Sequence, residues 1–380
     1  MIALLLALAA LGIWLYLIFA RGGFWRCAER DQWETPELAT WPSVAAVVPA
    51  RNEADHVATS LGSLLNQNYP GSFTIVMVDD GSTDDTGAIA RRMTQARSEM
   101  PARVVDGQTL PPGWTGKLWA LKQGIASADE ERPDYLLFTD ADITHPPNSV
   151  ARLVAFAEQH RLVLTSLMVK LRCRSFAERA NIPAFVFFFQ MLYPFAWVNR
   201  KDKAVAAAAG GCMLVRAAVL AKAGGIDTIR GALIDDCALA RTLKPHGPIW
   251  LGLTQRVHSV RAYPRLRDIR RMVARSAYAQ LRYSPALLVA TAAGMMVTYL
   301  APPLLAVFGS GTCRLIGLTA WALMAFAFLP TLRFYQLSPL WALALPAIAF
   351  EYLLFTLDSA YQHVQGRGGT WKGRAQGKNL

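Results

Sequence analysis

The chain has 380 residues, of which 53% are hydrophobic and 17% charged, and it carries a formal net charge of +12. Its mean hydropathy of +0.24 excludes an ordinary soluble globule. The five cysteines form no C-x-x-C pair, which argues against structural zinc and against a disulfide framework. The positive charge gathers beside apolar segments, so the expected partner is a bilayer with anionic lipids and not nucleic acid.

Four long segments without a charged side chain indicate a membrane protein, because each is near the roughly 20 residues needed to cross a bilayer. They cover positions 1–20, 285–309, 315–332 and 334–350. The first segment has no basic residue before it and no small-residue cleavage site, so we predict an uncleaved anchor rather than a signal peptide. The predicted organisation is an anchor over 1–21, a polar domain over 40–284, a C-terminal transmembrane region over 285–358 and a basic tail over 359–380.

The arginines beside these segments predict their orientation. Arg21, Arg26 and Arg30 follow the first segment, and between positions 256 and 282 there are eight arginines and a single acidic residue, Asp268. Basic flanks stay on the cytoplasmic side of a membrane. We therefore expect a multi-pass protein of the bacterial inner membrane whose polar domain is cytosolic.

Between positions 44 and 170, short apolar runs alternate with amphipathic patterns. Strands are predicted at 44–48, 73–78, 103–106, 135–139 and 162–169, and helices near 57–65, 117–128 and 147–159. This alternation predicts an α/β fold with a mostly parallel sheet that is covered on both faces. Ligands of such sheets bind at the carboxyl ends of the strands, so the polar residues that follow the strands are the candidate site residues.

Three polar motifs follow predicted strands, and we expect them to meet at one edge of the sheet. "PARNE" follows the first strand, "DDGSTDDT" the second and "DAD" the fourth. In the first motif, Asn52 could instead cap a helix, and in the second, Gly81 could form a turn before a cap at Ser82 or Thr83. The acids of the second motif lack the spacing of a calcium loop. A carboxylate pair at a strand end can instead bind the hydroxyls and imino group of a nucleoside.

The "DAD" motif places the carboxylates of Asp140 and Asp142 one residue apart at the end of a strand. Two like charges so close favour a hard cation, and oxygen ligands suit Mg²⁺ or Mn²⁺ that bridges phosphates. The earlier stretch "PPGWTGKLWAL" is not a Walker A loop, because its spacing is G-x-x-G-K and Leu118 replaces the Ser or Thr. Lys117 is then either a contact to a diphosphate from a flexible loop or a surface lysine.

Asp235 and Asp236, in "GALIDDCALARTL", stand where an amphipathic helix is predicted to begin. They are either carboxylates that the dipole of the helix N-terminus favours or a catalytic pair. A desolvated carboxylate beside other negative groups has a raised pKa, which suits a general base that takes a proton from an attacking hydroxyl.

Taken in order, six motifs resemble the family-2 inverting glycosyltransferases of the GT-A fold over residues 40–285. They are "PARNE", "VDDGSTDDT", "TGKLWAL", "FTDAD", "GGCMLVR" and "IDDCALARTL". The anchor, the "QHVQGRGGTWKGR" ending and the C-terminal apolar runs resemble more narrowly the hopanoid-biosynthesis-associated glycosyltransferases, relatives of ceramide glucosyltransferase. The resemblance implies a nucleotide-diphosphate sugar as donor, a UDP-sugar above all, and a lipid acceptor such as a hopanoid.

The resemblance also implies roles for individual residues. The nucleotide sugar would contact Ala50, Arg51, Glu53, Asp80, Lys117 and Asp140. Asp142, with Asp140 beside it, would bind the metal, and Gly210 and Gly211 would shape the acceptor side. Asp236 would be the base, with Asp235 before it in the place of the family's usual glutamate.

Three other functions are weighed against this one. The Q-x-x-R-W motif of processive polysaccharide synthases appears here only as Gln280-Leu281-Arg282-Tyr283, which argues against polymer synthesis. A non-catalytic scaffold that binds nucleotide sugars would not require a base. A cation-dependent nucleotidyltransferase shares the "DAD" motif but gives no role to Asp236.

Two segments are expected to hold the site against the bilayer. The aromatic segment 180–203 is interrupted by Pro194 and looks too short to span, so we predict an interfacial helix or the lining of a groove. The arginine-rich segment 256–282 is expected to act with it.

The tail presents a conflict, because three C-terminal crossings would place it outside the cell. Its basic residues favour the cytosol; they are Arg367, Lys372, Arg374 and Lys378. One apolar run then fails to cross, either 285–309, where Pro302-Pro303 removes two backbone donors, or 334–357, where Glu351 is costly at membrane depth. We favour a cytosolic tail, with 371–374 near the nucleotide site.

Overall fold

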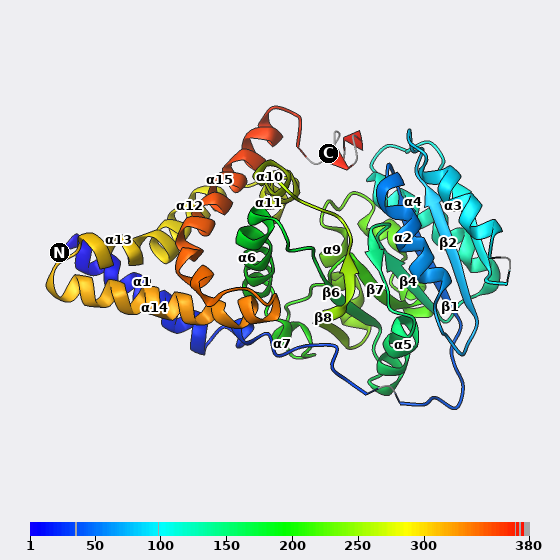
Figure 1. Cartoon of the computed structure of the whole chain (residues 1–380), viewed down its shortest axis with the longest axis horizontal. Helices are drawn as coiled ribbons and strands as arrows, with labels where there is room; N and C mark the ends of the chain where they lie inside the picture. Colours follow the sequence, from blue (N-terminus) through cyan, green and yellow to red (C-terminus); the bar gives the residue numbers. More distant parts are fainter. Residues whose placement is uncertain (35, 98, 369, 372–373, 376–380) are drawn as a thin grey trace. The chain divides into compact units, whose positions relative to one another are not determined.

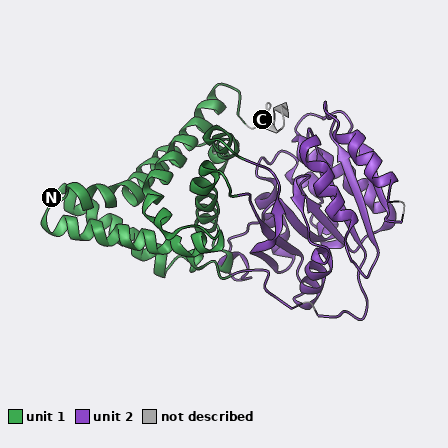
Figure 2. Ribbon diagram, viewed as in Figure 1, with its two compact units in different colours: residues 1–28, 173–196, 263–369 green, residues 29–172, 197–262, 370–380 purple. Residues whose placement is uncertain are grey.

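The computed structural model describes residues 1–34, 36–97, 99–368, 370–371 and 374–375. The chain divides into two compact units (Figure 2). The helical unit contains 1–28, 173–196 and 263–369, and the sheet unit contains 29–172, 197–262 and 370–380, where described. Segments 173–196 and 263–284, which the sequence places in the polar domain 40–284, therefore group with the helices.

The sheet has eight strands among the described residues, in the order β3-β2-β1-β4-β7-β6-β8-β5 (Figure 1). Their bounds are β1 (Val44–Ala50), β2 (Phe73–Asp79), β3 (Ala102–Asp106), β4 (Tyr135–Thr139), β5 (Ile143–Thr144), β6 (Leu164–Lys170), β7 (Cys212–Arg216) and β8 (Ile249–Ser259). The first four in this order are parallel, whereas β7 is antiparallel to both of its neighbours. The predicted α/β fold with a mostly parallel sheet is confirmed.

Both faces of this sheet are covered by helices. The longer helices of the unit are α2 (Ala54–Leu65), α3 (Thr86–Gln95), α4 (Gly116–Ala128), α5 (Ser149–Gln159), α8 (Ala217–Lys222) and α9 (Asp235–Leu243). On one face, Val44 of β1 shares a core cluster with Leu61 of α2. On the other face, Val47 lies against Gly124 of α4, where a Cβ would come within 2.3 Å of Val47 Cγ1. A strand buried on both faces is continuously apolar in sequence.

The carboxyl edge of the sheet collects the predicted motifs. β1, β2 and β4 are parallel neighbours, so the residues after Ala50, Asp79 and Thr139 leave the sheet at the same edge. The antiparallel β7 pairs its first residue, Cys212, with Thr139, which brings Gly211 to that edge as well.

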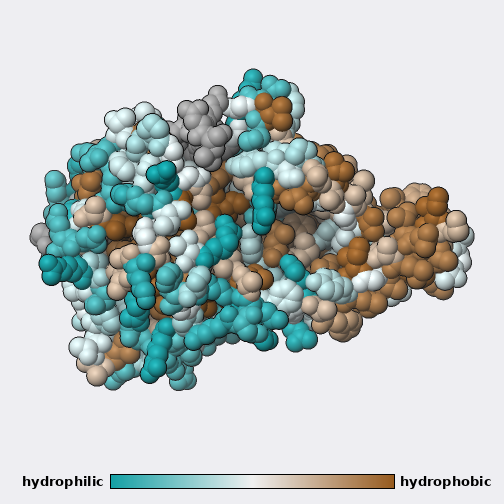
Figure 3. Space-filling view, turned by 180° about the vertical axis from the view of Figure 1, so that it is seen from behind, coloured by the Kyte–Doolittle hydropathy of each residue, from teal (hydrophilic) through white to brown (hydrophobic). Residues whose placement is uncertain are grey.

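The remaining helices belong to the helical unit, except that α7 crosses its boundary with the sheet unit. They are α1 (Ile2–Phe19), α6 (Phe176–Leu192), α7 (Phe195–Val198), α10 (Leu266–Ala274), α11 (Ala277–Gln280), α12 (Pro285–Met295), α13 (Ala301–Phe308), α14 (Gly311–Phe334) and α15 (Leu345–Val364). Five segments of the described chain are long and apolar enough to cross a membrane, namely Ile2–Phe19, Phe176–Val198, Pro285–Phe308, Gly311–Phe334 and Pro339–Val364. The exposed large apolar side chains of the described residues all lie in the helical unit, and Figure 3 shows the hydrophobic surface gathered over it. These features indicate membrane association.

The expectation that segment 180–203 is too short to span is wrong by length. A capping box of Ser175 and Glu178 starts α6 at Phe176, so that the apolar stretch Phe176–Val198 reaches 23 residues. Connectivity nevertheless excludes a single crossing, because β6 before this stretch and β7 after it pair in the same sheet. The interfacial placement of the segment stays a prediction.

Candidate active site

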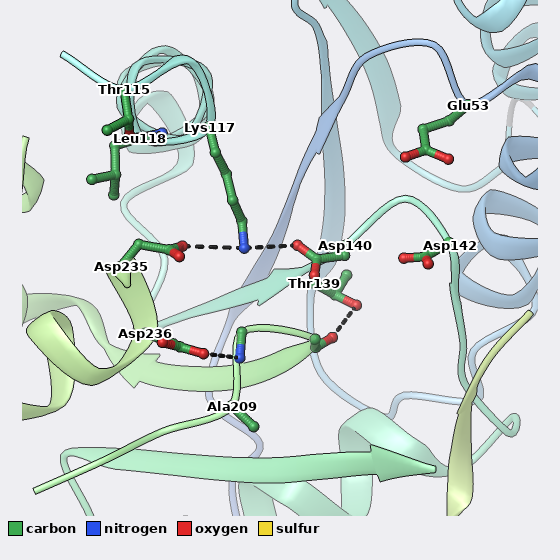
Figure 4. Close-up of polar contacts among 12 residues, drawn as sticks. Glu53, Thr115, Lys117, Leu118, Thr139, Asp140, Asp142, Ala209, Asp235 and Asp236 are labelled. Carbon is green, nitrogen blue, oxygen red and sulfur yellow. Dashed lines mark hydrogen bonds and ion pairs between the residues drawn. The ribbon is translucent and has the colours of Figure 1, made fainter. Parts of the chain in front are cut away.

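Lys117 connects the predicted metal motif with the predicted catalytic pair. It lies in the first turn of α4, which Thr115 caps by accepting a hydrogen bond from Leu118 N. Its Nζ is 2.9 Å from Asp140 Oδ1 and 3.1 Å from Asp235 Oδ2 (Figure 4). Burial alone would lower the pKa of Lys117, but the two carboxylates raise it above its ordinary value. The lysine is therefore a permanent cation, and not the surface lysine that the sequence left open.

Asp236 is a half-buried carboxylate beside this cation. It lies in the first turn of α9, as the sequence predicts, and its Oδ2 accepts a hydrogen bond of 2.9 Å from Gly210 N. Burial, and then the charge of Asp235, raise its pKa from 3.8 to about 6, although Lys117 and two backbone N–H groups oppose the shift. Such a pKa suits a general base near neutral pH.

Gly210 keeps space between these groups. A Cβ on this residue would be 3.1 Å from Lys117 Nζ and 3.4 Å from Asp236 Oδ2. Gly211, next to it, accepts a hydrogen bond of 2.8 Å on its carbonyl oxygen from Thr139 Oγ1. The glycine pair thus lets the loop before β7 approach the charged side chains closely.

A second ion-pair cluster lies on the other side of Asp140. Arg261 Nε is 2.8 Å from Asp142 Oδ2, and its Nη2 is 2.5 and 2.6 Å from the two carboxylate oxygens of Glu53. Ser259 Oγ donates to the same oxygen of Asp142 over 3.1 Å. Figure 4 shows Glu53 and Asp142 apart from Lys117 and its two aspartates. Sequence reasoning missed both of these residues. Ser259 is the last residue of β8, and Arg261 lies just after the strand.

The loops after β1 and β2 are hydrogen-bonded to each other. Arg51 donates to the carbonyl oxygens of Asp80 and Gly81, and Asp80 N donates to Ala50 O over 2.8 Å. Asp80, predicted beside the base and ribose, is fully buried. The predicted contacts Ala50, Arg51 and Asp80 are thus adjacent. Glu53 lies two residues after Arg51 in the loop that follows β1.

The alternative readings of these loops are in part wrong. Asn52 does not cap α2, whose N-cap is Glu53; it adopts a φ of 50° and accepts a hydrogen bond of 2.8 Å from Thr83 N. Gly81 does take a positive φ, of 62°. The cap of α3 is Asp85 and neither Ser82 nor Thr83.

His145 is hydrogen-bonded to Thr139, the residue just before the metal motif. Its Nε2 is 2.9 Å from Thr139 Oγ1, and its Nδ1 is 3.4 Å from Ser149 Oγ. Burial lowers its pKa to about 4, so the ring is neutral at physiological pH. His145 could not be recognised from the sequence, because no motif connects a lone histidine in a loop with Thr139 or Ser149.

The carboxylates of the "DAD" motif point to different cations. Asp140 faces Lys117 and Asp142 faces Arg261. The described residues contain no group of three His, Cys, Asp or Glu side chains that could hold a metal by themselves. A Mg²⁺ or Mn²⁺ site of one or two carboxylates completed by substrate phosphates and water requires no such group. The hard oxygens of Asp142 and Asp140 fit that kind of site.

Two family models match the chain. "Glycosyl transferase family 2" matches residues 45–224, and "Glycosyl transferase family group 2" matches residues 135–354. Because the second covers more than half of the chain, the protein belongs to this group of glycosyltransferases.

Individual proteins resemble the chain less completely. The chain is 35% identical over 103 residues to 4,4'-diaponeurosporenoate glycosyltransferase of Staphylococcus aureus strain bovine RF122 / ET3-1, a match of 27% of this chain and 24% of the relative. It thus spans about a quarter of the curated relatives that it matches. A solved mannosyltransferase from Pyrobaculum calidifontis, in complex with GDP-Man and Mn²⁺, is similar over 96% of this chain and 99% of that chain. Its TM-score is 0.55 at 18% sequence identity, so the likeness shows the GT-A fold.

Proposed function

We propose that the protein is a membrane-bound inverting glycosyltransferase that moves a sugar from a nucleotide-diphosphate sugar to a lipid hydroxyl. The observation that carries the proposal is Asp236. It is a half-buried carboxylate with a pKa of about 6, placed at the sheet edge where ligands of such folds bind. Its neighbours in that place are Lys117 and the "DAD" motif of a chain that belongs to a glycosyltransferase family.

The side chains then have distinct roles in the transfer. Asp236 takes the proton of the acceptor hydroxyl. At the same time the hydroxyl oxygen bonds to the sugar carbon, and the bond between that carbon and the diphosphate oxygen breaks. Lys117, held between Asp140 and Asp235, supplies positive charge where the diphosphate leaves. A divalent cation, held by Asp142 and Asp140, would neutralise charge on the same diphosphate.

The donor is a nucleotide-diphosphate sugar, and we retain the UDP-sugar that the sequence resemblance implies. Mn²⁺ or Mg²⁺ as cofactor is supported by the mannosyltransferase of the same fold, whose structure contains Mn²⁺. Because that structure also contains GDP-Man, both UDP-sugars and GDP-mannose must be assayed.

The acceptor is a lipid in the cytosolic leaflet of the inner membrane. Three features support this: five segments apolar enough to span, the exposed apolar surface of the helical unit, and a relative whose name contains a diaponeurosporenoate. A hopanoid remains our specific proposal, from the sequence resemblance alone. Within the arginine-rich segment 256–282, Arg261 pairs with Glu53 and Asp142 in the site, and exposed arginines such as Arg267 and Arg271 would bind anionic headgroups.

The experiment is a transfer assay on membranes that contain the full-length protein. Membranes are supplied with UDP-glucose, UDP-N-acetylglucosamine or GDP-mannose and with Mn²⁺ or Mg²⁺, and lipid products are measured by mass. We expect one donor to add one hexose to a lipid, and chelation of the cation to stop the reaction. Binding of donors without any product would instead indicate a scaffold, and a ladder of masses would indicate a processive synthase.

A further inference from the structure

Arg261 joins two carboxylates that the sequence resemblance assigns to different tasks. It bridges Asp142, the predicted metal ligand, and Glu53, a predicted nucleotide contact. The side chains of Arg261, Asp142 and Glu53 are 22%, 12% and 8% exposed. Charges this well shielded from water interact strongly, so the bridge is a firm electrostatic link between the loops after β1 and β4.

The bridge competes directly with a metal ion. Arg261 Nε lies 2.8 Å from Oδ2 of Asp142, an oxygen that a cation on this side chain would use. A guanidinium and a divalent cation on one carboxylate repel each other, because positive charges a few ångströms apart oppose each other's binding. The metal therefore competes with the guanidinium for Asp142, and a further anion beside Glu53 that binds the guanidinium would favour its release.

We propose that Arg261 is an internal counter-ion that the divalent cation displaces from Asp142, and that the displaced guanidinium binds the diphosphate of the nucleotide sugar. The inference rests on the proposed function, from which it takes the diphosphate. A planar guanidinium binds a phosphate through two parallel hydrogen bonds. In the bridge, Nε of Arg261 donates to Asp142 and Nη2 to Glu53, so release from Asp142 frees the Nε–H beside Nη2 for an anion. Metal and nucleotide then favour each other's binding beyond their direct contact.

The test measures binding by purified full-length protein in detergent. Free Mn²⁺ is followed by electron paramagnetic resonance without nucleotide, and UDP and GDP binding is followed by calorimetry with and without Mn²⁺. Arg261→Met keeps an unbranched apolar stem and removes the charge. We expect this variant to bind Mn²⁺ alone roughly tenfold or more tightly, because a neighbouring charge changes the proton affinity of a carboxylate by a similar factor. We expect it to bind the nucleotide in Mn²⁺ less tightly than the wild type.

Two further variants separate this role from a structural one. Arg261→Lys keeps the charge, so Mn²⁺ binding should stay near wild type while nucleotide binding falls, because an ammonium lacks the planar fork. Arg103→Met removes a different arginine, whose partner is the partly exposed Glu131, and should change neither affinity.

The two steps of the proposal fail separately. Unchanged or weaker Mn²⁺ binding in Arg261→Met contradicts the proposal that the cation displaces Arg261 from Asp142. The same holds if this variant binds both Mn²⁺ and the nucleotide less tightly. Unchanged nucleotide binding in Mn²⁺ overturns the contact to the diphosphate. If the wild type binds neither UDP nor GDP, the proposed function and the diphosphate step fail, and Mn²⁺ binding alone still decides the displacement.

Discussion

At the scale of single residues, the ion pairs of Lys117 distinguish Asp236 from two other aspartates. Lys117 pairs with Asp140 and Asp235 and leaves Asp236 with two backbone hydrogen bonds and a raised pKa. Of the two adjacent carboxylates, Asp236 is therefore the candidate base, because Asp235 is engaged in the ion pair with Lys117.

We predict that Asp236→Asn keeps nucleotide binding and loses turnover by about 10²-fold or more, the scale of a lost general base. The change preserves the size of the side chain and can keep its oxygen as an acceptor for Gly210 N. Turnover and donor affinity, measured on the same preparation, check this. Near-normal turnover in Asp236→Asn together with a large loss in Asp235→Asn would identify the neighbour as the base.

The same residue predicts the acid limb of the pH profile. The pKa of Asp236 is raised to about 6, so the carboxylate is protonated and inactive below that pH and ionised above it. We expect kcat/KM to rise through about pH 6 and to level off above it, with roughly a tenfold loss per pH unit on the acid side. Lys117 stays protonated over this range, because its own pKa is raised. A profile that is flat from pH 5 to 8 would contradict the assignment.

The candidate residues that the sequence could identify are those that follow predicted strands. The positions of Glu53, Asp80, Asp140 and Asp142 follow from the rule that parallel strands end at one edge. Arg261 could not be found in this way. It follows β8, whose last residues pair with the two-residue β5, and a pairing between positions 143 and 259 leaves no local signal.

At the scale of elements, burial explains which strands were recognisable. All residues of β1 and the first six of β2 are buried, and their continuous apolar runs were located to within two residues. In β8 the buried first half is followed by exposed positions, among them Gln255 and Arg256, that resemble a loop. β7 was noticed only as part of a motif, because it runs directly into α8 at Ala217 and no turn residue marks its end.

The helix α10 is an amphipathic element whose arginines were predicted to contact lipid. Ile269 and Val273 are buried in the helical unit, whereas Arg267, Arg270 and Arg271 are exposed. Arg270 lies 3.8 Å from Asp358 of another helix, α15, whereas Arg267 lies 3.8 Å from Asp268 of its own helix. Arg267 and Arg271 are therefore the probes that leave the contact between α10 and α15 intact.

We predict that bilayers with anionic lipid stimulate transfer by the wild type and stimulate Arg267→Ser/Arg271→Ser much less. Each arginine near an anionic surface contributes about 1 kcal/mol to binding at that surface. The measurement compares transfer rates in nanodiscs of phosphatidylcholine with and without phosphatidylglycerol. Arg97→Ser, an exposed site in the sheet unit, is the matched control. Equal stimulation of all three proteins would exclude α10 as the lipid contact.

At the scale of the whole molecule, the basic residues of the helical unit define one end of its spanning helices. Arg21 follows α1, Arg333 lies in the last turn of α14, and the arginine-rich segment precedes α12. The opposite ends of α13 and α14 meet at Gly309 and Ser310, near the lone Arg314. By the positive-inside rule, we predict that α1, α12–α13 and α14 cross the membrane with the C-terminal ends of α1 and α14 and the N-terminal end of α12 in the cytosol.

The proline pair does not prevent α12 and α13 from crossing. The chain stays helical from Pro285 to Phe308, with a π-helical turn at Met296–Leu300 just before Pro302-Pro303. A wider turn can accommodate the ring and the missing donors of a proline pair. Of the two runs that could fail to cross, the structure therefore favours the later one, which contains Glu351.

The contacts of α15 place both of its ends near the cytosolic ends of the other helices. It follows the end of α14, and near its own end Ser359 bonds Ala274 O and Tyr278 N, while His363 stacks on Tyr283 just before α12. In Figure 1, α6 and α15 run across the direction of α1 and α14. Glu351 of α15 accepts a hydrogen bond of 3.1 Å from Asn181 of α6, so α15 is joined to the segment that is itself predicted to be interfacial.

We therefore predict that α15 lies along the cytosolic interface and that the tail is cytosolic. Tail positions 372–373 and 376–380, which include Lys372 and Lys378, lie outside the described residues. The positions chosen for cysteine substitution are therefore Arg367, Ser310 and Gln336, which are all exposed. In a Cys173→Ser/Cys313→Ser background, a membrane-impermeant thiol reagent should label Ser310→Cys in intact spheroplasts. It should label Gln336→Cys and Arg367→Cys only after lysis, because three crossings separate the N-terminus from the cytosolic tail. Labelling of Arg367→Cys without lysis would mean that α15 crosses and that the tail lies outside the cell.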